Sequence, residues 1–67
     1  MNTLDAATLT DAQWIEQTLD AMLMRDPVLN RWDVQPMVEE MAQRPRWRSM
    51  RPEAAAARVF GDKGVSV

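Results

Sequence analysis

The chain has 67 residues, which is enough for one domain with one small core. It contains no cysteine and no histidine, which excludes disulfides and thiolate metal sites and removes the commonest general base. The formal net charge is −2, but residues 1–43 hold eight acids and two bases (−6), whereas residues 44–67 hold six bases and two acids (+4).

We interpret residues 1–67 as a single domain whose ends, at 1–8 and 62–67, are frayed. A core this small is marginal on its own, so we expect a protein partner or self-association. No apolar run approaches the length of a membrane span and the N-terminus is acidic, so we expect a cytoplasmic protein without a membrane contact.

The first predicted element is a helix over residues 10–25, on which we expect the rest of the chain to pack. Thr10 and Gln13 have the spacing of a capping box, and Leu9 and Trp14 that of a hydrophobic staple. Helical spacing gives this segment one apolar stripe, made of Ala12, Ile15, Leu19, Met22 and Leu23.

Asp26-Pro27 ends this helix and predicts a short helical corner at 27–32. Asp33 is the expected cap of a second helix over 34–44, with Pro36 in its first turn, where the missing N–H does no harm. The expected buried face of this helix is Val34, Met37, Val38, Met41 and Ala42.

Residues 44–52 contain two prolines and no apolar period, so we expect an irregular loop there. Pro52 then begins a third helix over 52–60, and Gly61 is the expected residue that ends it. Its predicted buried side chains are Ala56, Val59 and Phe60. The prediction is therefore a small all-α, three-helix domain with the first two helices antiparallel and the third laid across them.

The C-terminal segment RPEAAAARVFGDKGVSV resembles the first helix and turn of helix-turn-helix modules, in which a Pro-Glu-Ala-Ala run leads through a small turn to a recognition helix. The sequence stops about where that recognition helix would begin. The resemblance implies a turn after Phe60, and we carry over no function from it.

Few side chains could catalyse a reaction. Apart from carboxylates and arginines there are Lys63 and hydroxyls such as Ser49 and Thr18, and the adjacent Glu39 and Glu40 point about 100° apart on a helix. The sequence has no Gly-rich phosphate loop, nucleophile elbow or acidic metal loop. We therefore expect no enzymatic activity, no cofactor, no metal and no small-molecule substrate.

The segment 44–51 carries four arginines around Trp47. Guanidinium groups beside an aromatic plate suit single-stranded nucleic acid or a phosphorylated partner. The alternative is that Trp47 is buried and the arginines pair with the acids of the first half of the chain. The negative net charge weakens the nucleic-acid interpretation, because binding to phosphates needs a basic surface.

We predict a small non-enzymatic protein–protein interaction module, such as a regulator, an inhibitor or an assembly factor. The motivation is a marginal core together with more methionine and tryptophan than that core needs. The predicted contact residues are Met24, Trp32, Arg46, Trp47, Arg48, Met50 and Arg51. The alternatives are nucleic-acid binding through the segment 44–51 and a plain homodimer.

Overall fold

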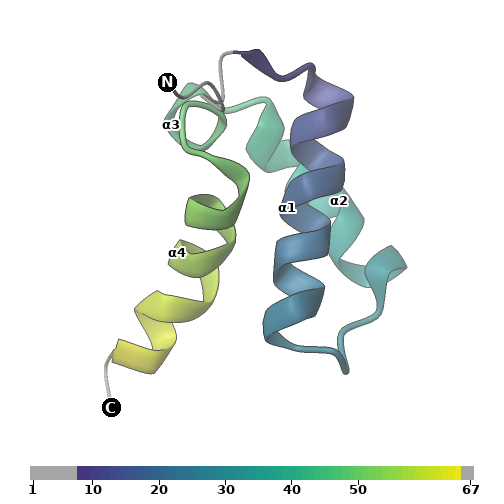
Figure 1. The fold of residues 1–67 in the computed structure, drawn as a ribbon, viewed down its shortest axis with the longest axis vertical. Helices are drawn as coiled ribbons and strands as arrows, with labels where there is room; N and C mark the ends of the chain where they lie inside the picture. Colours follow the sequence, from purple (N-terminus) through teal and green to yellow (C-terminus); the bar gives the residue numbers. More distant parts are fainter. Residues whose placement is uncertain (1–7, 66–67) are drawn as a thin grey trace.

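A computed structural model describes residues 8–65. These residues form four helices and no strand, which confirms the all-α prediction: α1 (Asp11–Arg25), α2 (Arg31–Ala42), α3 (Pro45–Arg48) and α4 (Pro52–Val65) (Figure 1). Of the ends predicted to be frayed, residues 1–7 and 66–67 lie outside the described residues, whereas residues 62–65 belong to α4.

The capping box expected at the start of α1 is present. The backbone N–H of Gln13 donates to Oγ1 of Thr10 at 3.1 Å, and the backbone N–H of Thr10 donates to Oε1 of Gln13 at 2.9 Å. Leu9 and Trp14, on either side of this box, both pack into the hydrophobic cluster. The start of α1 is therefore defined by local sequence.

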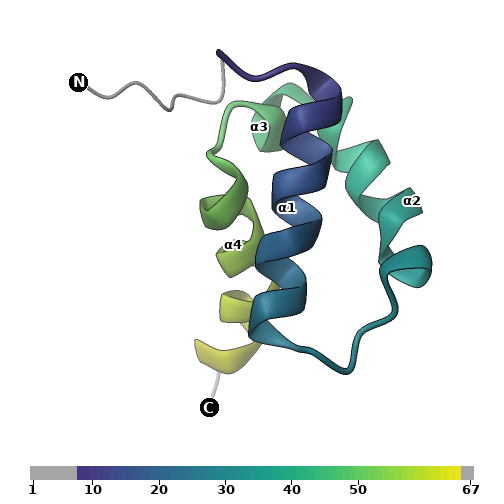
Figure 2. The same cartoon turned by 45° about the vertical axis from the view of Figure 1, so that its right-hand side comes forward.

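Helix α1 is the centre of the molecule, with α2 on one side and α4 on the other (Figures 1 and 2). As predicted, α1 and α2 run in opposite directions, while α4 runs in the same direction as α1. The short helix α3 connects α2 to α4 at the end of the bundle where α1 begins. Because α1 has two neighbours, it needs two apolar faces.

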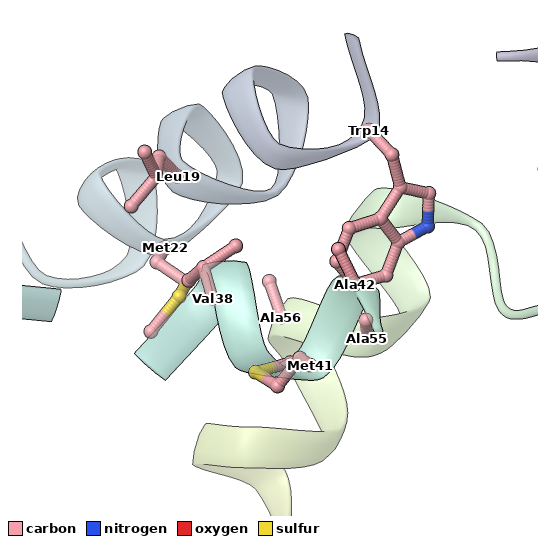
Figure 3. Packing of buried hydrophobic residues seen from close by; sticks show 8 residues of the cluster. All are labelled: Trp14, Leu19, Met22, Val38, Met41, Ala42, Ala55 and Ala56. Carbon is pink, nitrogen blue, oxygen red and sulfur yellow. The ribbon is translucent and has the colours of Figure 1, made fainter. Parts of the chain in front are cut away.

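The core lies where these three longer helices meet (Figure 3). The indole of Trp14 lies over Ala42 of α2 and Ala55 of α4, and its N–H donates to the carbonyl oxygen of Met50 at 2.8 Å. A buried indole N–H needs such an acceptor. The buried apolar side chains are Trp14, Leu19, Met22, Val38, Met41, Ala42, Ala55 and Ala56.

The single stripe predicted for α1 is too narrow. Ala12, expected to be buried, is exposed, and Thr18, considered only as a possible catalytic hydroxyl, is fully buried. Trp14, Thr18 and Ala21 follow one another at helical spacing and form a second face, beside the predicted one. The indole hydrogen bond to Met50 shows that this face points toward the segment between α3 and α4.

The predicted helical corner at 27–32 is wrong, because residues 26–30 form a turn and α2 begins at Arg31. The cap is Asn30 and not Asp33: its side-chain oxygen accepts from the backbone N–H of Trp32 at 2.9 Å. Pro36 consequently lies inside the helix, beyond its first turn, and removes one backbone hydrogen bond there.

Met37, which was predicted to lie on the buried face of α2, is 41% exposed, and α2 ends at Ala42, earlier than predicted. The segment expected to be an irregular loop contains α3, because Pro45 occupies a first-turn position where its fixed φ favours a helix. Helix α4 does not end at Gly61 but continues to Val65, so the turn implied by the helix-turn-helix resemblance is absent. Ala56 is fully buried as predicted, whereas Val59 and Phe60 are half-buried against the core.

Candidate interaction surfaces

The structure divides the seven predicted contact residues between two ends of the molecule. Met24 and Trp32 lie on either side of the turn between α1 and α2. The other five lie in and just after α3, at the opposite end of α1 (Figure 1). They are Arg46, Trp47, Arg48, Met50 and Arg51.

At the first end, three large apolar side chains are exposed. The exposed fractions are 83% for Met24, 90% for Val28 and 75% for Trp32. We call these three residues the corner surface. Val28 is not among the contact residues predicted from the sequence, and its neighbour Leu29 differs from it in packing against the core.

Local structure explains why these side chains point outward. The carboxylate of Asp26 accepts from the backbone N–H of Val28 at 3.2 Å, which makes the turn a compact one stabilised by its own side chain. Trp32 precedes the buried Val38 by six residues, and this separation corresponds to a rotation of about 120° around the helix axis. Since Val38 faces the core, Trp32 points away from α1. The asparagine cap fixes the start of α2 and therefore the direction of Trp32.

Several of the basic residues pair with carboxylates inside the molecule. Arg44 contacts Glu40 at 3.2 Å and Arg51 contacts Glu53 at 3.5 Å. Arg31 contacts two carboxylates of α1, Glu16 at 2.5 Å and Asp20 at 3.3 Å. The acidic first half of the chain is thus partly neutralised by arginines of the fold itself.

Arg48 is the most enclosed of the arginines in the segment 44–51. Its Nε donates to a carboxylate oxygen of Asp11 at 2.9 Å, and its Nη2 donates to the carbonyl oxygen of Leu9. Its guanidinium carbon lies 5.9 Å from the centre of the Trp14 ring, within the range of a cation–π contact. Arg48 therefore ties the start of α1 to α3.

Arg46 differs from its neighbours, because its exposed side chain pairs with no carboxylate of the described residues. It lies at a pocket of about 270 Å³ between α3 and α4, which we call the basic pocket. The lining residues are Arg46, Trp47, Met50 and Arg58. Trp47 is half-buried: it packs against the core and also lines this pocket.

Arg58 was missed from the sequence, although it is a base in the middle of α4 that directly follows a run of four alanines. Only the packing of α4 beside α3 shows that it meets Arg46 and Trp47 at one pocket. Among the side chains of residues 8–60, no three acidic ones gather in a way that could hold a metal ion. In the part of the chain that the structure describes, no helix has the length and apolarity to cross a membrane.

Comparisons of the chain with protein-family models, with curated proteins and with solved structures found no match.

Proposed function

We propose that this chain is a small non-enzymatic interaction module, a regulator, inhibitor or assembly factor, that binds a partner protein in the cytoplasm through the corner surface. The observation that carries the proposal is the exposure of Met24, Val28 and Trp32 within nine consecutive residues. Tryptophan is enriched among the residues that dominate binding energies, and methionine adapts its shape to a partner. Burial of these side chains would release the water that now covers them.

The corner surface is supported by a rigid base. Arg31, one residue before Trp32, pairs with Glu16 and Asp20 of α1, so the start of α2 is held to α1 from outside the core. The cap on Asn30 adds a second restraint next to the indole. A pre-positioned tryptophan loses little conformational freedom when it binds.

A photo-crosslinking side chain at position 32 or 28, introduced into the chain in its native host, tests the proposal. We expect one discrete product with a different protein from both positions and none from position 17, where the exposed Gln17 of α1 serves as the control. A folded chain that gives no product at position 32 or 28 would overturn the proposal. A crosslinked product with the mass of two copies of this chain would show that the corner surface mediates self-association and does not bind a different protein.

Nucleic-acid binding through residues 44–51 has less support. Three of the four arginines of that segment face carboxylates, namely those of Glu40, Asp11 and Glu53. Each pair must open or share its charge before phosphates can bind. Titration with single- and double-stranded oligonucleotides at two salt concentrations tests this alternative, and a complex that weakens steeply with salt would favour it.

A further inference from the structure

We propose that the basic pocket is a second binding site, which takes a short acidic peptide segment carrying one aromatic side chain. This inference goes beyond the corner surface and does not depend on it, because the two sites lie at opposite ends of α1.

The size of the pocket favours part of a peptide over a whole small molecule. Its volume of about 270 Å³ lies below the range of roughly 300–1,000 Å³ that is typical for ligand and cofactor sites. A single large side chain and the backbone beside it would use such a space. The chemistry of the lining residues then decides what that side chain is.

Trp47 and Met50 form the apolar part of the pocket. An indole face favours an offset or edge-on aromatic ring, and a thioether makes favourable contacts with a ring edge. The indole N–H of Trp47 donates to no acceptor among the described residues, unlike that of Trp14. It can therefore donate to a carbonyl or carboxylate of a bound segment.

Arg46 and Arg58 supply the charged part from two different helices. A guanidinium group matches the geometry of a carboxylate with two parallel hydrogen bonds. Two guanidinium groups at the same pocket as an aromatic ring thus fit a segment in which acidic residues flank an aromatic one.

Charge beyond the pocket favours a short peptide over a nucleic acid. The neighbouring cations Arg44, Arg48 and Arg51 are already paired with carboxylates of this chain. A long polyanion leaving the pocket would meet these neutralised pairs and a molecule of net negative charge. A short segment needs to reach only the two arginines that line the pocket, Arg46 and Arg58.

The test is an NMR titration of the full-length, ¹⁵N-labelled chain. The probe is a capped five-residue peptide, a phenylalanine with one glutamate and one aspartate on each side. We expect signal changes at the Trp47 indole N–H and at the Nε–H groups of Arg46 and Arg58, with the Trp32 indole unchanged. No change at Trp47 with about 1 mM peptide, or a change at Trp32 of equal size, overturns the proposal.

Matched variants separate the pocket from general attraction between opposite charges. Arg46→Gln with Arg58→Gln should weaken binding about tenfold, whereas Arg44→Gln with Arg51→Gln removes the same charge and should change it less than about threefold. All four side chains are exposed, so both double variants should fold, and circular dichroism checks this. Equal weakening by both pairs overturns the proposal.

Two further probes examine the ligand class. A peptide with glutamine and asparagine in place of the acids, and one with alanine in place of phenylalanine, should each bind at least about tenfold more weakly. Tighter binding of a ten-nucleotide oligothymidylate than of the acidic peptide would overturn the proposal and indicate that the pocket binds single-stranded nucleic acid. Failure here leaves the crosslinking result at position 32 unaffected, so the two proposals fail separately.

Discussion

At the residue scale, Arg48 carries more of the structure than its position in an arginine-rich segment suggests. It contacts Asp11, the carbonyl of Leu9 and the face of Trp14, and only 20% of its side chain is exposed. We expect Arg48→Ala to lower the free energy of unfolding by about 1–2 kcal/mol, mainly because the carbonyl and the ring lose their partner. The exposed Asp11 carboxylate contributes little to this loss.

Urea unfolding measures the effect, and Arg46→Ala is the matched control from the same short helix. Because Arg46 is exposed and pairs with no carboxylate of the described residues, its removal should change the free energy by less than about 0.5 kcal/mol. Equal losses in the two variants would contradict the structural role of Arg48.

Thr18 is the second residue whose environment makes a prediction. Its side chain is fully buried, and its Oγ1 has no hydrogen-bond partner among the described residues. An orphan hydroxyl in a core is costly, so Thr18→Val should raise the free energy of unfolding by about 1 kcal/mol. Thr18→Ser keeps the hydroxyl and loses a methyl group, so this variant should have a free energy of unfolding that is lower by about 1 kcal/mol. A Thr18→Val variant less stable than the original chain in the same urea series would show that the hydroxyl is bonded.

At the element scale, the start of α2 shows where local sequence signals compete. Both Asn30 and Asp33 are good caps, and the sequence favours Asp33 when Pro36 is required to lie in the first turn. The structure uses Asn30 and accepts Pro36 inside the helix. The reason is tertiary, because an earlier start brings Arg31 onto the helix, from which it reaches the carboxylates of Glu16 and Asp20.

The two candidate caps give opposite predictions. Asn30→Ala should lower the free energy of unfolding by about 1 kcal/mol, because the backbone N–H of Trp32 loses its acceptor. Asn30→Ser should restore most of the loss. Asp33→Ala should cost less than about 0.5 kcal/mol, since Asp33 acts only on the helix dipole. Thermal unfolding of the three variants measures this, and a larger loss for Asp33→Ala would show that α2 begins later.

At the scale of the whole molecule, the sequence predicts the helical class, the central role of α1 and the antiparallel pairing of α1 with α2. The site is less predictable. Met24 and Trp32 follow from the presence of more methionine and tryptophan than a small core needs, but the meeting of Arg58 with Arg46 and Trp47 depends on how α4 lies beside α3. Helical periodicity describes one element at a time, so it does not reveal which face of α1 receives its second neighbour.

That second neighbour is α4, and its alanines allow the close approach. Ala55 and Ala56 are fully buried, whereas Ala54, one residue before them, is exposed. We expect Ala56→Leu to lower the free energy of unfolding by about 1–3 kcal/mol, because the larger side chain must push α4 away from α1. Ala54→Leu should change it by less than about 0.5 kcal/mol, although it adds the same atoms to the same helix. Urea unfolding followed by circular dichroism measures both free energies. Because α2 and α4 both pack on α1, the Ala56→Leu variant should still unfold in one transition. A separate early loss of helix in that variant would show that α4 folds independently of the α1–α2 pair.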